Sequence, residues 1–322
     1  MSRNHDSIKY QIRQAVEYGK IRNQNTKHSY RRSIDKVSEW LKANGIRDLS
    51  AVTTAVIQQY ETDLAADPKE YSPATIHGYL IPICKAAGVP LDRIRKPKRS
   101  AATITRSRRE NANTQGNREA ERPENQRLVS FQRAVGIRRS ELARLKGRDL
   151  IEDNGQLFVL VERGKGGKRQ RQWILPADQE IVRQTFAGIA PDQSVFSGAE
   201  MANKIDLHSI RAEHARDCYA YYAKLVKRPG AADRLRRAML RRFDAENGQL
   251  LQMDPAAYRR KRDKFIADMG DAPYLLRGEN REKAIAAGQP TEYNRLCLLA
   301  TSVFHLSHWR LDVTVTNYLV RG

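Results

Sequence analysis

The chain has 322 residues, and 58 lysine and arginine residues against 37 aspartate and glutamate residues give it a formal net charge of +21 at pH 7. A surplus of this size favours a polyanionic partner, of which nucleic acid is the usual one. No apolar run approaches the roughly 20 residues that a bilayer span needs, and the first residues lack the apolar stretch of a signal peptide. Length and composition therefore favour a nucleic-acid-binding protein of two packed domains and exclude an integral membrane protein.

The three cysteines, Cys84, Cys218 and Cys297, are far apart and form no C-x-x-C pair. This pattern indicates a reducing, intracellular compartment rather than a disulfide framework. Three cysteines cannot build a Cys₄ zinc site, whereas a mixed Cys/His site is not excluded by count alone. We expect no metal and no cofactor.

The first part of the chain has apolar side chains at helical spacing. They recur every three or four residues in 8–16, 26–44, 56–64 and 76–87. Ser72 and Pro73 predict the start of the last of these helices, with serine as the N-cap and proline in the first turn. The sequence therefore predicts a compact helical domain over residues 1–95.

A basic linker is expected over residues 96–127. Eleven lysine and arginine residues stand against four glutamates between Arg93 and Arg127, and large apolar side chains are few. Two interpretations remain open: a disordered basic spacer, or a linker that lies along a phosphate backbone.

From Leu128 onward the pattern is mixed. Residues 128–135 are helical, and the apolar runs 157–161 and 171–175 flank Gly-Lys-Gly-Gly-Lys, which predicts a β-hairpin with a glycine-rich tip. A phosphate-binding P-loop is disfavoured, because Lys168 is followed by arginine and the second flank is a strand. From Asp206 the chain is almost entirely helical. The expected fold class is mainly α with a small β-sheet.

Five short motifs follow one another in this second part. They are Gly-Ile-Arg-Arg-Ser-Glu-Leu at 136–142, the hairpin lysine, His-Ser-Ile-Arg at 208–211, Leu-Ser-His at 306–308 and Asn-Tyr-Leu at 317–319. In this order they resemble the catalytic motifs of the tyrosine recombinase (phage integrase) family. The resemblance implies a mixed α/β catalytic domain over 128–322, preceded by a helical, SAM-like core-binding domain over 1–95.

The resemblance also implies a catalytic role for six residues. Tyr318 would attack a DNA phosphodiester and hold the strand as a 3′-phosphotyrosine. Arg138 and Arg211 would bind the phosphoryl oxygens, and His308 would hydrogen-bond them. Lys165 would protonate the leaving 5′ oxygen, and His208 would act on the tyrosine proton. Glu141 is expected to hold Arg138 in place.

Other residues of these types have ordinary explanations. Lys168 is the rival of Lys165 for the hairpin role, although Lys165 sits inside Gly-Lys-Gly as in the family pattern. Tyr219, Tyr221 and Tyr222 have a spacing that suits core packing. His214 and His305 are expected to take no part in catalysis.

Three features depart from the family pattern. Ser307 stands where a glycine is usual, and His308 lies ten residues before Tyr318 where nine is commoner, so we expect the connecting loop to absorb one extra residue. A basic helical insertion occupies 224–293, with 16 lysine and arginine residues against 10 acidic ones. It is either a brace, a DNA-contacting arm or a protomer-docking element, and its deletion is expected to spare folding but harm synapsis.

The resemblance implies a site-specific DNA recombinase, or integrase, that integrates or excises a mobile element without metal or ATP. Its partner would be double-stranded DNA, bound by four protomers on two sites with accessory DNA-bending proteins, and its location the prokaryotic cytoplasm, at the nucleoid. Two alternatives remain: an enzyme like a type IB topoisomerase, and a catalytically silent DNA-binding protein on the same fold.

Overall fold

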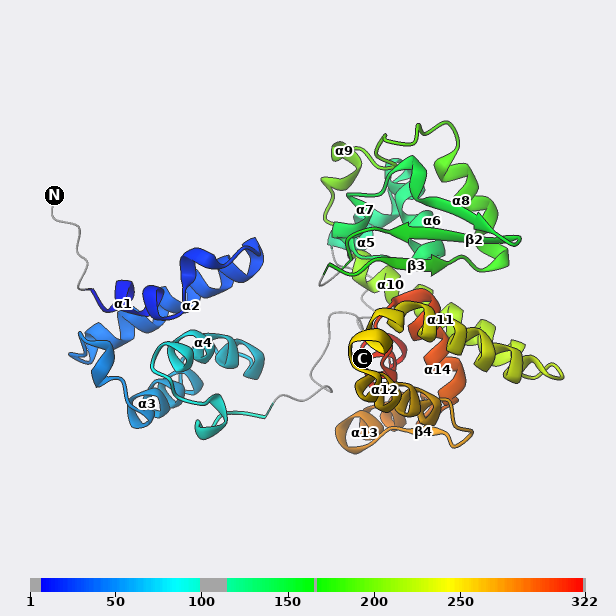
Figure 1. The fold of residues 1–322 in the computed structure, drawn as a ribbon. Helices are drawn as coiled ribbons and strands as arrows, with labels where there is room; N and C mark the ends of the chain where they lie inside the picture. The colour runs from blue at the N-terminus through cyan, green and yellow to red at the C-terminus, as the bar shows by residue number, and fades with distance from the viewer. Residues whose placement is uncertain (1–6, 99–114, 165–166, 321–322) are drawn as a thin grey trace. The chain divides into compact units, whose positions relative to one another are not determined.

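The computed structural model describes residues 7–98, 115–164 and 167–320, and the chain divides into two compact units, Met1–Ser100 and Ala101–Gly322 (Figure 1). Its described part is mainly α-helical with a small antiparallel sheet, which confirms the expected fold class. No helix in the described ranges is long and apolar enough to span a membrane. Most of the expected linker, 99–114, lies outside the described residues.

The first unit is a bundle of four helices, as the apolar spacing predicts. They are α1 (Ile8–Ala15), α2 (Gln24–Ala43), α3 (Thr54–Ala65) and α4 (Pro73–Ala86). Ser72 caps α4 through a hydrogen bond from the Thr75 N–H, and Pro73 occupies the first turn. One apolar core holds the four helices together and includes Ile12, Ile34, Ile57 and Leu80.

The second unit begins with helices that pack against a three-stranded sheet. The segments before the long helix α10 are α5 (Gln115–Glu121), α6 (Gln126–Val135), α7 (Arg139–Leu142), β1 (Leu150–Asp153), β2 (Gln156–Val161), β3 (Gln170–Trp173), α8 (Gln179–Phe186) and α9 (Gly198–Met201). The strands run β1-β2-β3, all antiparallel, with Phe158 opposite Trp173. The hairpin between β2 and β3 is the one that the glycine-rich tip predicts. Ala120 of α5, within the expected linker, packs against the core of this unit.

Helix α10 (Leu207–Leu225) separates this sheet layer from a second group of helices (Figure 1). That group contains α11 (Ala231–Met253), α12 (Pro255–Asp268), α13 (Gly278–Ala286), α14 (Arg295–Thr301) and α15 (Leu311–Thr314), with a two-residue ladder of β4 (Tyr274–Leu275) and β5 (Glu292–Tyr293). Two π-helical segments, η9 (Ser302–Leu306) and η10 (Val315–Leu319), follow α14 and α15. The β4–β5 ladder was not expected from the sequence.

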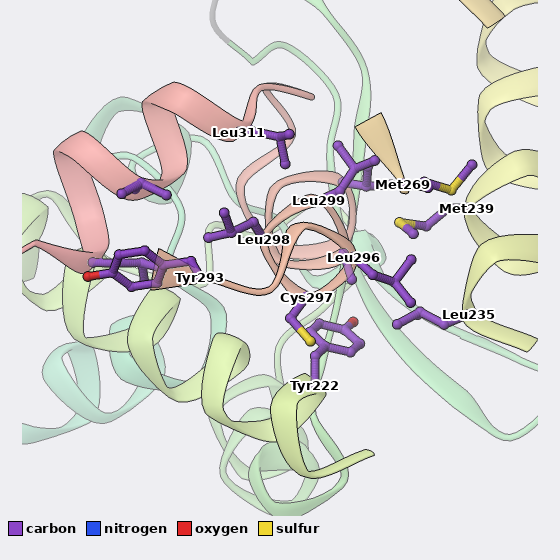
Figure 2. Packing of buried hydrophobic residues seen from close by; sticks show 14 of the residues in the cluster. Tyr222, Leu235, Met239, Met269, Tyr293, Leu296, Cys297, Leu298, Leu299 and Leu311 are labelled. Carbon is purple, nitrogen blue, oxygen red and sulfur yellow. The ribbon is translucent and has the colours of Figure 1, made fainter. Parts of the chain in front are cut away.

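The insertion 224–293 shares a core with the C-terminal helices. Leu235 and Met239 of α11 are buried in the same cluster as Leu296 and Leu299 of α14, and Figure 2 shows these side chains gathered together with Tyr222 of α10. Removal of 224–293 would expose the inner face of α14. This packing argues against the expectation that the insertion can be deleted without loss of folding and favours its role as a brace.

An aromatic cluster ties the insertion to the loop that follows η9. The ring of Trp309 lies 5.9 Å from that of Phe243 on α11 and 5.3 Å from that of Phe265 on α12. Phe243 and Phe265 are themselves stacked at 4.9 Å. Such offset ring pairs add to the apolar burial, so the insertion helps to fix the backbone on both sides of Trp309.

Phe265→Ala therefore should destabilise the whole second unit. Phe265 is 5% exposed, and truncation of a buried phenylalanine costs about 3–5 kcal/mol. We expect its free energy of unfolding, measured with urea and followed by circular dichroism, to fall by about that amount. Ile266→Ala, at a neighbouring residue that is 42% exposed, should change this free energy little. A separate, weak transition confined to the insertion, with the rest of the unit unchanged, would contradict the shared core.

Candidate active site

Arg211 lies at the centre of the candidate site and is almost completely buried, with 1% of its surface exposed. Its guanidinium group donates to the backbone carbonyl of Gly136, and through Nη2 to the carbonyl of Leu306 at 2.9 Å. Its Nε donates to the hydroxyl oxygen of Tyr318 at 3.4 Å. One side chain of α10 thus joins three of the predicted motifs, which lie 75 to 107 residues away along the chain.

Tyr318 lies next to both predicted histidines. Its ring centre is 5.7 Å from that of His208, and 5.8 Å from that of His308, which is nearly parallel at 13°. The guanidinium carbon of Arg211 is 5.6 Å from the same ring. The structure therefore places three of the six predicted residues, Arg211, His208 and His308, next to a fourth, Tyr318, which is only 5% exposed.

Gly136 allows Arg211 to approach. It ends α6 with φ +62°, in the left-handed region that favours glycine. A Cβ atom at this position would collide with the ring of His214, which lies on α10 one turn after Arg211. The missing side chain lets α10 pack close to the end of α6, so the Gly136 carbonyl is within reach of the guanidinium group.

Arg138 is held by Glu141, as the sequence predicts. The guanidinium Nη1 of Arg138 donates to Glu141 Oε1 at 2.8 Å, and the Arg138 backbone N–H donates to Oε2 at 2.8 Å. The carboxylate is buried whereas the Arg138 side chain is 26% exposed. An arginine that is held through one guanidinium nitrogen and is still partly exposed is suited to binding an anion.

Ser302 holds the ring of His308 in place. Its Oγ accepts from the Arg310 backbone N–H at 2.9 Å and lies 3.0 Å from His308 Nδ1. Nε2, the other ring nitrogen, is buried and has no hydrogen-bond partner within the described residues. The ring thus presents one unused nitrogen beside Tyr318.

Burial, and then the positive charges of Arg211, Arg138 and Arg310, lower the pKa of His308 to about 3. The ring is consequently neutral at physiological pH. The influence of Arg138 also places this arginine near the other site residues.

The segment that contains Tyr318 has a π turn. In η10 the Val320 N–H bonds the carbonyl of Val315 at 3.0 Å, five residues earlier, which is the hydrogen bond of a π-helix. A π turn holds one residue more than an α turn, and Tyr318 within it contacts Arg211. The expectation that the connecting loop absorbs the extra residue between His308 and Tyr318 stays a prediction.

The backbone at Ser307, where the family usually has a glycine, is stabilised by contacts of its own. Ser307 has φ +54° and Trp309 has φ +58°, so two left-handed residues that are not glycine flank His308. Such backbone costs about 1–2 kcal/mol per residue for ordinary side chains. The Ser307 hydroxyl donates to Gln172 Oε1 at 2.9 Å, and the Trp309 ring packs on the insertion, which hold this conformation in place.

Lys165, the predicted general acid, lies outside the described residues. Its rival Lys168 is exposed at the base of the hairpin turn, where its carbonyl accepts from the Gly164 N–H at 2.8 Å. Tyr222 is buried in the core and Tyr219 and Tyr221 pack against it, in agreement with their expected packing role.

Sequence reasoning missed two residues that position the site. Gln172 of β3 is fully buried, donates to the His305 carbonyl at 2.7 Å and accepts from Ser307. Ser302 lies 3.0 Å from His308 Nδ1 and holds that ring in place. Nothing in the sequence singles out Ser302, and the burial of Gln172 becomes visible only in the fold.

One buried group has the residue types of a metal site. One ligand atom from each of His214, Cys218 and His305 lies within 4.8 Å of the other two. These side chains already have partners: His214 Nδ1 donates to the Arg133 carbonyl, Cys218 Sγ is 3.4 Å from His214 Nε2, and His305 Nε2 is 3.0 Å from the Tyr222 hydroxyl. The three side chains are thus explained as a polar cluster within the core.

Comparisons with known proteins give low-identity similarities to solved structures. No protein-family model and no curated protein matches the chain. The XerH site-specific recombinase bound to difH substrate, in a pre-cleavage complex, is 13% identical over 62% of this chain and 70% of its own, with a TM-score of 0.39. The Tn1549 transposon integrase in complex with circular intermediate DNA is 12% identical over 70% and 89%, with a TM-score of 0.40. A XerA recombinase is 17% identical over 64% and 83%, with a TM-score of 0.23.

The buried neutral histidines predict that stability falls in acid. Burial lowers the pKa of His214 to about 4 and that of His308 to about 3, from 6.5. Between pH 6.5 and the lowered pKa values, the unfolded chain takes up protons that the native state does not. The free energy of unfolding therefore falls as the pH falls below about 6.5, by up to about 1.4 kcal/mol per pH unit for each histidine.

His308→Gln should reduce the slope of the free energy of unfolding against pH by the contribution of about one proton, measured by urea unfolding between about pH 6 and pH 4. His28→Gln, which removes an exposed histidine from the first unit, is the matched control. An unchanged slope in His308→Gln would show that His308 takes up its proton equally in the native and unfolded states and would contradict a buried, neutral ring.

Proposed function

We propose that the chain is a site-specific DNA recombinase that cuts and rejoins DNA strands through a covalent bond between Tyr318 and a 3′ phosphate. The observation that carries this proposal is the contact of the Tyr318 hydroxyl with buried Arg211, with the rings of His208 and His308 both next to the tyrosine. A nucleophile, a fixed positive charge and two imidazoles are the groups that phosphoryl transfer to a tyrosine needs.

In the proposed reaction the Tyr318 oxygen forms a bond to phosphorus while the bond from phosphorus to the 5′ oxygen breaks. The tyrosine proton passes to His208, and the 5′ oxygen takes a proton from Lys165. The phosphotyrosine keeps the energy of the broken bond, so attack by a different 5′ hydroxyl rejoins the strand by the reverse steps. General acid–base catalysis of this kind contributes roughly 10²–10⁴ in rate.

The phosphoryl oxygens would be bound by Arg138, Arg211 and Nε2 of His308. Arg211 has five N–H groups, and three of them account for its bonds to Gly136, Leu306 and Tyr318. Two therefore remain for the phosphate. Because Tyr318 covers Arg211 and both are buried, the phosphate can reach this arginine only after the η10 segment moves.

The wider proposal concerns DNA and assembly. Residues 1–95 and the basic segment 96–127 would bind the DNA duplex next to the second unit, which makes affinity strongly dependent on salt. Exchange of strands needs two DNA sites and four protomers, with accessory DNA-bending proteins, and would serve integration or excision of a mobile element. The contact of Tyr318 with Arg211, made despite the longer spacing from His308, argues against a catalytically silent protein.

Covalent capture in cells tests this function. Wild type and Tyr318→Phe are expressed, the cells are denatured rapidly, and the ends of protein-linked DNA are sequenced. We expect sharp ends at a few loci for the wild type and none for Tyr318→Phe, because phenylalanine has no oxygen to attack phosphorus.

Tyrosine-dependent ends scattered over the whole genome would instead indicate an enzyme like a type IB topoisomerase. No linked DNA from a wild-type protein that still binds DNA would indicate a silent DNA-binding protein.

A further inference from the structure

A broad groove opens beside His308 in the second unit. Its volume is about 1310 Å³, and its walls come from the end of the β2–β3 hairpin, from α11 and α12 of the insertion, and from residues 308–312. Seven lysine and arginine side chains line it against three carboxylates. The insertion therefore forms one wall of a basic groove that begins at a residue of the candidate site.

Most of the positive side chains of the groove are paired, and two are not. Lys264 pairs with Asp268 at 3.0 Å, and Arg310 pairs with Asp312 at 2.6 Å. Lys168 on the hairpin and Lys261 on α12 are exposed and have no ion pair within the described parts of the chain. Two uncompensated positive charges on separate walls favour an anion in the groove between them.

The place of the groove decides what kind of anion fits. A DNA strand carries one phosphate for about every 3.4 Å of helix axis. A phosphate that is held at Tyr318 therefore brings its neighbours on the same strand past His308. A groove that begins at His308 and carries unpaired lysines is suited to those neighbouring phosphates.

We propose that this groove binds the sugar-phosphate backbone of DNA beside the cleaved phosphate, with Lys261 as a contact from the insertion. The insertion 224–293 then has two roles: it braces the loop of His308 through Phe243 and Phe265, and it extends the DNA-binding surface. This inference rests on the proposed function, because it needs a DNA phosphate at Tyr318.

A matched pair of variants on α12 tests the proposal. Lys261→Gln removes a charge from the groove. Arg259→Gln removes a charge two residues earlier, roughly 200° around the helix, from an exposed side chain that does not line the groove. Both proteins have the same net charge, so a difference between them reports position rather than overall electrostatics.

Binding is measured in the Tyr318→Phe background, which prevents cleavage, with the DNA fragment recovered by covalent capture and with a scrambled duplex of equal length. The affinity is followed over a series of salt concentrations. We expect Lys261→Gln to weaken binding to both duplexes and to reduce the slope of log affinity against log salt by about 0.9, the value for one lost phosphate contact. Arg259→Gln should leave the slope unchanged.

Equal slopes for the two variants would overturn the proposal. The proposal is also overturned if Lys261→Gln binds DNA normally but fails to recombine it in the protein that keeps Tyr318. That result would identify the groove as a protomer-docking surface. If the wild type gives tyrosine-linked DNA but the two variants do not differ, the groove inference fails alone. If the wild type neither binds nor captures DNA, the proposed function fails with it.

Discussion

The site depends on the burial of the Arg211 guanidinium group. A buried positive charge without partners is strongly destabilising, and here the carbonyls of Gly136 and Leu306 and the hydroxyl of Tyr318 supply the partners. Those three groups belong to the end of α6, the end of η9 and the η10 segment. The need to satisfy one arginine therefore holds three distant segments of the chain together and places the tyrosine.

The sequence predicts the helices, the hairpin and the order of the motifs, because these depend on local spacing. Ser72 and Pro73 start α4 as expected, and His208 and Arg211 lie one turn apart on α10. The π turn of η10 and the left-handed backbone at Ser307 could not be predicted. Both are maintained by residues far away in the chain, such as Gln172, which bonds Ser307 from 135 residues earlier.

The insertion shows that a segment which stands out in the sequence need not fold independently. Residues 224–293 stand out by their length and basic charge, but Leu235, Met239 and Phe265 are buried in the same core as the C-terminal helices. Apolar residues in a helix pattern indicate a buried face without indicating what covers it. The partner face, on α14, lies beyond the insertion and could be identified only from the fold.

The central claim is that Tyr318 is the nucleophile of the site that Arg211 organises. Its most direct measurement is the chemical identity of the protein–DNA bond: the wild-type protein is captured on DNA and digested with nuclease and protease, and the nucleotide-bearing peptide is sequenced by mass spectrometry. The account predicts a phosphodiester remnant on Tyr318. A remnant on any other residue, such as Tyr219 or Tyr221, would contradict it.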